Sequence, residues 1–375
     1  MQQPVSCSSR DCDIEDSVIA SLRVKAGVTA FIPLGRLWAL AYARTRISAS
    51  PGQHFSHGKS PMNSPAHWFD GFESRTFEVN GTSIHLRFSK VARGELPRPA
   101  LLLLHGFPQS HVMWHRVAQR LSQHYFLVMP DLRGYGDSAK APGLPDHGNY
   151  SKRSMAGDMA AVMQMLGLDQ FYLCGHDRGG RVAHRLALDH AHRVRKLCVI
   201  DIAPTLDMYE GRSMTEPYMA FARAYYHWFH MLQPAPLPEI MMGANHPETA
   251  LAYLHAKLGG WGSAGLGYIE PQALAEYERC FCNAQALHAA CEDYRASGGI
   301  DLDHDRQSRE QGLKVACDLL VLTGERGVVN RLFDPMALWR AQCDGRVTGK
   351  ALPAGHFIPE EQPEATARAL QEFFI

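Results

Sequence analysis

The sequence has no excess of either charge. Its 375 residues contain 38 lysines and arginines and 38 aspartates and glutamates. A domain that binds nucleic acid carries a strongly basic face or stripe, which this balance does not provide. We therefore expect no nucleic-acid partner.

Long apolar runs are also missing. Residues 24–46 are apolar, but a proline, a glycine and an arginine within 33–36 leave this segment short of the roughly 20 residues that cross a bilayer. Its arginines resemble those of a transit peptide, but the acidic run DCDIED at 11–16 argues against one. We expect no membrane span. Residues 1–64 are expected to be a disordered extension or, if translation begins at Met62, not to be translated.

The nine cysteines follow no regular spacing, and their number is odd. Cys174 and Cys198 lie in apolar, strand-like runs, where a thiol packs as a small hydrophobic side chain. A secreted disulfide scaffold would show an even number of cysteines in a framework. The pattern predicts free thiols and a reducing compartment, the cytoplasm.

From about residue 66 the sequence alternates between short apolar runs and helical periods. An Asn-Gly pair divides the alternating segment 75–89, which predicts a β-hairpin. A helix is expected within 154–168, and further strands are expected within 99–107, 125–138, 170–177, 193–204 and 316–325. Strands that alternate with helices predict a parallel sheet covered on both faces.

Between residues 205 and 300 this alternation stops. The segment contains AYYHWFHM and KLGGWGSAG and is rich in aromatic and helix-forming residues. We expect a helical insertion over the carboxyl ends of the strands, where open α/β sheets bind their ligands. The expected division is an N-terminal extension at 1–64, a first core segment at 65–204, a helical cap at 205–290 and a second core segment at 291–375.

The stretch YLCGHDRGG, residues 172–180, places Asp177 in a G-x-nucleophile-x-G motif between an expected strand and an expected helix. This is the context of a nucleophile elbow, whose glycines leave room for neighbouring elements. The helix N-terminus and two nearby arginines, Arg178 and Arg181, favour an ionised carboxylate. The structural alternative is an aspartate that only caps the helix.

A carboxylate can displace a leaving group from saturated carbon, and the resulting enzyme ester must then be hydrolysed. His356, in the loop AGHFIPEE near the C-terminus, is the candidate general base. Asp201, which ends the run KLCVID, is the candidate that orients this histidine, in preference to Glu325. The backbone N–H groups of Phe107, in HGFPQ, and of Arg178 form the candidate oxyanion hole.

Residues 66–375 resemble the α/β-hydrolase superfamily and, within it, the fluoroacetate (haloacetate) dehalogenases. The segments that carry the resemblance are HGFPQSHVMWH, PDLRGYGDS, GHDRGGRVAHRLALDH, DIAPT, YHWFHMLQPAPLPE, CEDYRA and GHFIPEE. The resemblance implies an α/β fold with a mostly parallel eight-stranded sheet, flanked by helices and with a helical cap inserted after strand six. It implies a hydrolase that converts haloacetate to glycolate and halide through an aspartyl ester, without a cofactor or metal.

The resemblance also assigns roles to individual residues. The nucleophile, the base and the orienting acid match Asp177, His356 and Asp201. The pair that binds the substrate carboxylate matches Arg178 and Arg181, and the donors to the halide match His227, Trp228 and Tyr294. Two guanidiniums can grip a small carboxylate through charge-assisted hydrogen bonds, and N–H and O–H donors can meet the charge on departing fluoride. The structural alternatives are arginines paired with nearby acids and an aromatic run that only lines the cap.

Two other functions stay open. An epoxide hydrolase uses the same Asp–His–Asp machinery, but it is expected to have two cap tyrosines and a tryptophan after the nucleophile, where this chain has Arg178. A non-catalytic small-ligand-binding homologue of the fold would have no need of the orienting acid.

The expected partners are few. They are a small haloacid, water and, from the resemblance alone, a second copy of the chain in a homodimer. His111 and His115 are spaced as metal ligands on a helix would be, but no third ligand is evident, and we expect them on a surface helix.

Overall fold

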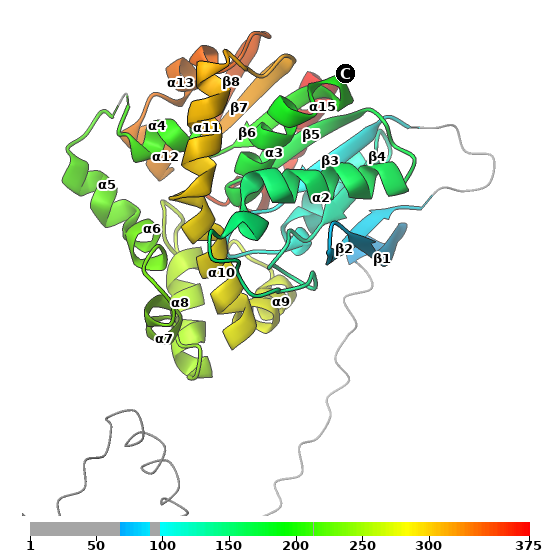
Figure 1. Cartoon of the computed structure of the whole chain (residues 1–375). Coiled ribbons are helices and arrows are strands. Elements are labelled where there is room, and N and C mark those ends of the chain that lie inside the picture. The colour runs from blue at the N-terminus through cyan, green and yellow to red at the C-terminus, as the bar shows by residue number, and fades with distance from the viewer. Residues whose placement is uncertain (1–67, 91–97, 213) are drawn as a thin grey trace, which may run out of the picture. The chain divides into compact units, whose positions relative to one another are not determined.

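The computed structural model describes residues 68–90, 98–212 and 214–375 (Figure 1). The predictions made for residues 1–64 lie outside these residues. In the described part of the chain, no helix is both long and apolar enough to cross a membrane.

Eight strands form one sheet in the order β1-β2-β4-β3-β5-β6-β7-β8. The strands are β1 (Phe72–Val79), β2 (Thr82–Ser89), β3 (Ala100–Leu104), β4 (Phe126–Pro130), β5 (Phe171–His176), β6 (Val194–Ile200), β7 (Asp318–Gly324) and β8 (Val347–Leu352). The β1–β2 and β2–β4 pairs are antiparallel, and all other neighbours are parallel. The predicted mostly parallel, eight-stranded sheet is confirmed.

The strands follow the apolar runs of the sequence. All five residues of β3, ALLLL, are buried, as a strand covered on both faces requires. The β1–β2 hairpin turns at Asn80 and Gly81, whose φ angles of 47° and 73° suit a tight turn between twisted strands. The last strand, β8, has three exposed residues in its middle and only one neighbour in the sheet, so its sequence carries a weak apolar signal.

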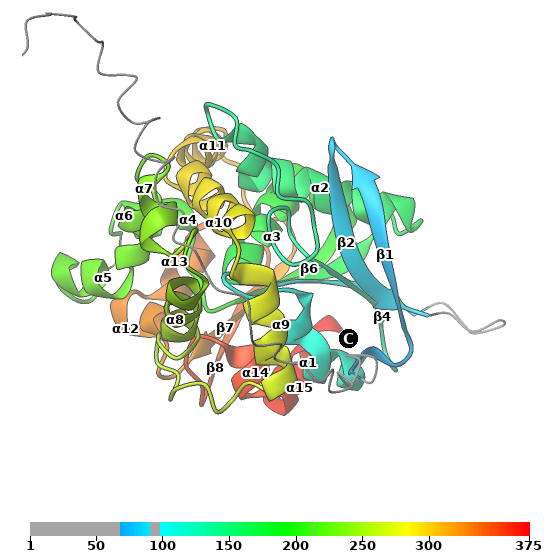
Figure 2. The same ribbon diagram turned by 90° about the horizontal axis from the view of Figure 1, so that it is seen from below.

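Helices cover both faces of this sheet (Figure 2). The helices α2 and α3 lie together on one face, and α1 and α15 lie together on the other. The core helices are α1 (His115–Leu121), α2 (Lys152–Met165), α3 (Arg178–Asp189), α12 (Val328–Leu332), α13 (Pro335–Ala341), α14 (Ile358–Glu361) and α15 (Pro363–Phe374). Short 3-10 helices are η4 (His111–Trp114), η5 (Gly148–Tyr150) and η6 (Ala191–Arg193).

A helical cap follows β6, as predicted, and the chain returns to the sheet at β7 (Figure 1). Its helices are α4 (Thr205–Tyr209), α5 (Tyr218–Ala224), α6 (Tyr226–Met231), α7 (Leu237–Met241), α8 (Pro247–Leu258), α9 (Pro271–Phe281), α10 (Ala284–Ser297) and α11 (Ile300–Glu310). The expected end of the cap at 290 needs correction, because that residue lies within α10 and helices continue to Glu310.

The turn between β5 and α3 packs tightly against β3. A Cβ atom on Gly179 would lie 2.2 Å from the carbonyl oxygen of His105, and one on Gly175 would lie 2.4 Å from that of Gly179. Real Cβ atoms essentially never come this close to backbone. Glycine at both positions therefore lets the turn at residue 177 sit directly beside the loop that follows β3.

Candidate active site

Asp177 occupies the turn between β5 and α3. Its φ and ψ angles of 47° and −117° are strained for a residue with a side chain, and such strain is typical of a nucleophile elbow. One carboxylate oxygen, Oδ1, accepts a hydrogen bond from the backbone N–H of Phe107 at 2.9 Å. The side chain is 13% exposed, and it lines a small pocket at the carboxyl ends of the central strands. Asp177 therefore presents an oxygen atom to a pocket rather than only capping a helix.

His356 and Asp201 complete a carboxylate–imidazole–carboxylate row. The Nε2 atom of His356 lies 3.7 Å from Oδ2 of Asp177, and its Nδ1 atom lies 2.6 Å from Oδ2 of Asp201. Asp201 follows β6 and also accepts the backbone N–H of Gly324 at 3.1 Å. Glu325, the alternative orienting acid, is exposed. The short contact to Asp201 fixes the imidazole so that Nε2 faces Asp177.

The charged groups in this row shift one another's pKa values. Burial alone would lower the pKa of His356, but its hydrogen bond to Asp201 and the negative charges of Asp201 and Asp177 raise the pKa above its ordinary value. Burial would raise the pKa of Asp177, but the nearby His356, His176 and two arginines lower it. Asp177 is therefore a carboxylate at neutral pH.

Arg178, the first residue of α3, is fully buried and already holds a counter-ion. Its Nε and Nη2 atoms donate to the two carboxylate oxygens of Asp293 at 2.9 and 2.7 Å, and Nη1 lies 3.3 Å from the hydroxyl of Ser297. Lys152 also contacts Asp293. Burial would lower the pKa of Arg178, but Asp293 holds it well above the ordinary value. The sequence analysis missed Asp293, although it lies within the segment CEDYRA.

Arg181, one turn further along α3, is buried without a carboxylate partner among the described residues. Its side chain is held by neutral groups: Nη1 donates to the hydroxyl of Thr205 at 2.9 Å and to the carbonyl of Ala203 at 3.3 Å. Its Nε atom has no partner within the described part of the chain. Burial, and then the charge of Arg178, lower its pKa. Arg181 lines the same pocket as Asp177, and its buried positive charge would be stabilised by a bound anion.

The aromatic residues of the cap close the pocket above these groups. His227 and Trp228, on α6, line it, and Tyr294, on α10, lies behind His227 with a ring-centroid distance of 5.5 Å. The ring of Tyr294 also lies under the guanidinium of Arg178, 4.2 Å from its central carbon. The three expected halide donors therefore lie near the two arginines. His227, Trp228 and Arg181 line the pocket, whereas Arg178 and Tyr294 do not.

The protonation of these donors follows from their burial. Burial, together with the positive charges of Lys257 and Arg178, lowers the pKa of His227 well below its ordinary value. Burial and the charge of Asp177 raise the pKa of Tyr294 well above its ordinary value. At neutral pH the pocket therefore holds a neutral imidazole and a protonated phenol. The Nδ1 atom of His227 is buried and has no hydrogen-bond partner in the described residues.

Two further aromatic residues line the pocket and were not singled out from the sequence. Tyr225 lies beside Trp228, with ring centroids 5.0 Å apart, and Trp261 lies 5.3 Å from the ring of His356. Tyr225 belongs to the aromatic run AYYHWFHM and Trp261 to the glycine-rich stretch KLGGWGSAG, which any apolar cap could contain, so only their position in three dimensions marks them.

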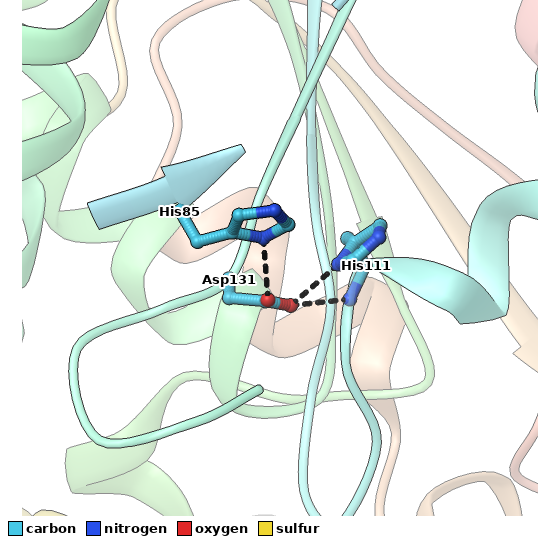
Figure 3. A group of neighbouring side chains, drawn as sticks. All are labelled: His85, His111 and Asp131. Carbon is cyan, nitrogen blue, oxygen red and sulfur yellow. Dashed lines mark hydrogen bonds and ion pairs between the residues drawn. The ribbon is translucent and has the colours of Figure 1, made fainter. Parts of the chain in front are cut away.

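A second polar cluster lies beside this site, around Asp131 (Figure 3). The Nδ1 atoms of His85 and His111 lie 3.1 and 2.9 Å from its two carboxylate oxygens, close enough together to hold a metal ion. However, Arg87 donates from Nε to Nε2 of His111 at 3.2 Å, which places a cation against the cluster. We interpret the cluster as a hydrogen-bond network that ties β2, β4 and the loop after β3 together.

The expectation that His111 and His115 lie on a surface helix was wrong. Both side chains are buried, with exposed fractions of 3% and 1%. His111 is held by Asp131, and His115 contacts the carbonyl of Val112 through Nδ1 at 2.8 Å. Histidines at this spacing can be satisfied in the core as well as on a surface.

Comparison with known proteins places the chain among α/β hydrolases. Residues 99–231 match the family model of the α/β hydrolase fold. The chain is 44% identical to a fluoroacetate dehalogenase of Burkholderia sp over 305 residues, which are 81% of this chain and 94% of that protein. It is 28% identical to a soluble epoxide hydrolase of Corynebacterium sp. (strain C12) over 283 residues, which are 73% of this chain and 89% of that protein.

Solved structures agree with this placement. A crystal structure from Nostoc sp PCC 7120, assigned to the α/β hydrolases, is 48% identical and superposes with a TM-score of 0.74 over 82% of this chain and 99% of that one. A structure from Pseudomonas aeruginosa assigned as an epoxide hydrolase is 35% identical, with a TM-score of 0.72 over 82% of this chain and 96% of that one.

The pKa of His356 provides a test of the row. We predict that its imidazole titrates above about 6.5, the ordinary value for histidine, because the negative charges of Asp201 and Asp177 outweigh burial. The Asp201→Asn change should lower this pKa, and by more than Asp177→Asn does, because Asp201 is both hydrogen-bonded and closer. NMR titration measures this pKa in the wild type and in the two variants, with His356→Gln to assign the signal. A larger drop in the Asp177 variant would be inconsistent with the observed contacts.

Proposed function

This chain belongs to the fluoroacetate dehalogenase family of the α/β hydrolases, and on that premise we propose that it hydrolyses the carbon–halogen bond of a haloacetate, giving glycolate and halide. The observation that carries the proposal is Arg181, a buried cation without a carboxylate partner in the described residues, in the same pocket as Asp177. A buried, unpaired charge costs several kcal/mol, so its retention favours an anionic ligand.

In the first step, an oxygen of Asp177 attacks the α-carbon of the haloacid. A bond forms between this oxygen and the carbon, the carbon–halogen bond breaks, and the halide leaves with the bonding electrons. The N–H of Phe107 holds Oδ1, which leaves Oδ2, the oxygen nearer His356, as the attacking atom. The lowered pKa of Asp177 supports this role, because the group reacts as a carboxylate and needs no base.

The carboxylate of the substrate binds to Arg181. Its Nη groups are anchored by Thr205, Ala203 and Met208, so the guanidinium is already oriented before a ligand arrives. Holding the carboxylate fixes the α-carbon beside Asp177, and such positioning lowers the barrier by removing the entropy cost of the encounter. Arg178 already uses two of its nitrogen atoms to bind Asp293, so it cannot offer a second bidentate pair of donors to the substrate. It contributes positive potential and the remaining N–H of Nη1.

The cap donors stabilise the departing halide. His227, neutral at pH 7, can offer one N–H, Trp228 the indole N–H and Tyr294 the phenol O–H. Fluoride leaves only when the charge that accumulates on it is met by donors already in place, and a pocket closed to water strengthens each of these contacts. The ring of His227 contacts that of Tyr294 directly and is linked to that of Trp228 through Tyr225, and this ring-contact network supports the assignment.

The second step hydrolyses the ester. His356 takes a proton from water, and the hydroxide attacks the carbonyl carbon of the Asp177 ester. The backbone N–H groups of Phe107 and Arg178 stabilise the tetrahedral oxyanion. The intermediate then collapses, and the glycolate oxygen leaves and takes the proton from His356. Asp177, which now carries one oxygen atom from water, loses the remaining proton to solvent and returns to the carboxylate.

The main alternative is an epoxide hydrolase with the same three catalytic residues. Two relatives with that name match this chain at 28% and 30% identity over 73% and 66% of its length. Tyr225 lines the pocket and could protonate an epoxide oxygen together with Tyr294. Against this stands Arg181, which a neutral epoxide would leave unpaired. A non-catalytic ligand-binding homologue is disfavoured, because such a protein would have no use for the short Asp201–His356 contact.

We further propose that the enzyme acts in the cytoplasm as a homodimer, with a small haloacid and water as substrates. The seven cysteines that lie in the described residues are all free, which is compatible with a reducing compartment.

Halide release tests the activity. On mixing with fluoroacetate, chloroacetate and bromoacetate, we expect stoichiometric halide and glycolate, because all three offer the carboxylate that Arg181 requires. Styrene oxide, a neutral epoxide, should give no diol above background. Ion chromatography measures the acids and halides. Diol formation without halide release would favour the epoxide hydrolase instead.

Replacement of the arginines separates their roles. Arg181→Lys should lower kcat/KM for chloroacetate by about a hundredfold, or about 2.7 kcal/mol of transition-state binding, because a point charge cannot reproduce the planar fork. Its melting temperature should change little. Arg178→Lys should lower the melting temperature as well, because it breaks the paired contact with Asp293 in the core. Steady-state kinetics measures kcat/KM and calorimetry measures the melting temperature of each variant. Wild-type kinetics in Arg181→Lys would remove the carboxylate-binding role.

A further inference from the structure

A second hollow lies next to the active-site pocket. It has a volume of about 740 Å³, and it opens between α5, α8, the loop at 260–262 and the segment 326–331, which includes most of α12. Trp261 and Val328 line both hollows, so the two share a wall. We call this hollow the vestibule. It is wide enough for a small hydrated anion to approach the pocket.

The lining of the vestibule is strongly basic. It contains four cations, Arg223, Lys257, Arg326 and Arg331, and a single acid, Glu216. The chain as a whole has equal numbers of acidic and basic residues, so this concentration is local. A concave surface lined by one sign of charge attracts ions of the other sign and raises their local concentration.

Three of these cations have no acidic partner in the described part of the chain. Arg223 and Arg331 are exposed, and their guanidiniums make no ion pair or hydrogen bond there. Arg326, in contrast, is paired with Glu361 at 3.1 Å and with nearby carbonyls. The unpaired positive charge of the vestibule therefore comes from Arg223, Arg331 and Lys257.

Lys257, near the end of α8, is 4% exposed and has no ion pair among the described residues. Its ammonium lies over the rings of Tyr226, Tyr253 and Trp261, at 3.8, 5.0 and 5.4 Å from their centres. Burial lowers its pKa to about 7. Such a lysine gains from an anion nearby, because a negative charge favours its protonated form.

Trp261 forms the wall between the vestibule and the pocket. Its φ angle of 53° lies in the left-handed region, and its indole N–H donates to the carbonyl of Ala224 at 3.2 Å. Its ring faces the pocket, with centroids 4.9 Å from His227 and 5.3 Å from His356. An anion in the vestibule is thus separated from the reacting groups by one side chain.

We propose that the vestibule captures the carboxylate of the substrate before it enters the pocket, with Arg223, Arg331 and Lys257 as the binding groups. This rests on the proposed function, because it assumes an anionic substrate. Capture raises the rate of productive encounter and leaves the chemical steps unchanged. Substrate binding therefore depends on ionic strength, since exposed charges are screened by salt.

The test compares two double variants that remove the same charge. Arg223→Gln/Arg331→Gln removes the two exposed arginines of the vestibule that have no partner in the described residues, and Arg195→Gln/Arg368→Gln removes two exposed arginines elsewhere. At low salt, kcat/KM for chloroacetate should fall about three- to tenfold in the first variant only, with kcat unchanged. The difference should disappear when sodium sulfate raises the ionic strength to about 0.5 M. Equal values in all three proteins, or an equal loss in both variants, would overturn the proposal.

A second measurement does not need turnover. Iodide quenching of tryptophan fluorescence reports anions beside Trp261, with Trp261→Phe as the reference that isolates its signal. We expect iodide to quench this signal at least threefold more weakly in Arg223→Gln/Arg331→Gln than in the wild type, and neutral acrylamide to quench both equally. Unchanged iodide quenching would overturn the proposal that the vestibule binds anions, even if halide release occurs. Absent halide release with the expected quenching would overturn the proposed function and retain the anion site.

Discussion

The balance of charge around Asp177 is the constraint on which the site depends. A carboxylate at the start of α3 is followed by two buried guanidiniums, and among the described residues only Arg178 has a carboxylate counter-ion, Asp293. The pair formed by Arg178 and Asp293 therefore behaves as part of the core, where breaking it leaves a buried charge uncompensated. Arg181 remains a positive group held by neutral oxygen and sulfur atoms. Burial would raise the pKa of Asp177, but His356, His176 and the two arginines together lower it, and the unpaired Arg181 leaves one place for a small anion.

The relatives of this chain are named for two activities, dehalogenation and epoxide hydrolysis. In the mechanism that we propose, the elbow, the Asp201–His356 contact and the Phe107 N–H serve as nucleophile, base and oxyanion donor for either electrophile. We propose that selectivity then comes from Arg181 and the cap aromatics. Relatives named as epoxide hydrolases match 73% and 82% of this chain, so similarity of sequence and structure alone does not separate the two activities.

Sequence reasoning was most reliable where the signal is local. Apolar runs predicted the buried strands, the Asn-Gly pair predicted the β1–β2 hairpin, and the glycine pattern predicted the turn at Asp177. The edge strand β8 has no apolar run that could have predicted it. The predicted cap boundary at residue 290 falls inside the helix α10, so no local signal marks it. The partner of Arg178 could not be predicted, because Asp293 is 115 residues away in the sequence and only the fold brings α10 to the first residue of α3. Likewise, His111 is held by Asp131, which follows β4 and is 20 residues away.

The covalent ester on Asp177 is the central claim, and the fate of the oxygen from water tests it most directly. With enzyme in excess, a single turnover of chloroacetate in heavy-oxygen water should place one labelled oxygen in the side chain of Asp177, because hydroxide attacks the ester carbonyl rather than the substrate. Peptide mass spectrometry locates the label, and the glycolate from this first turnover should contain none. Label in glycolate with an unlabelled Asp177 would show direct attack by water on the substrate and would contradict the account.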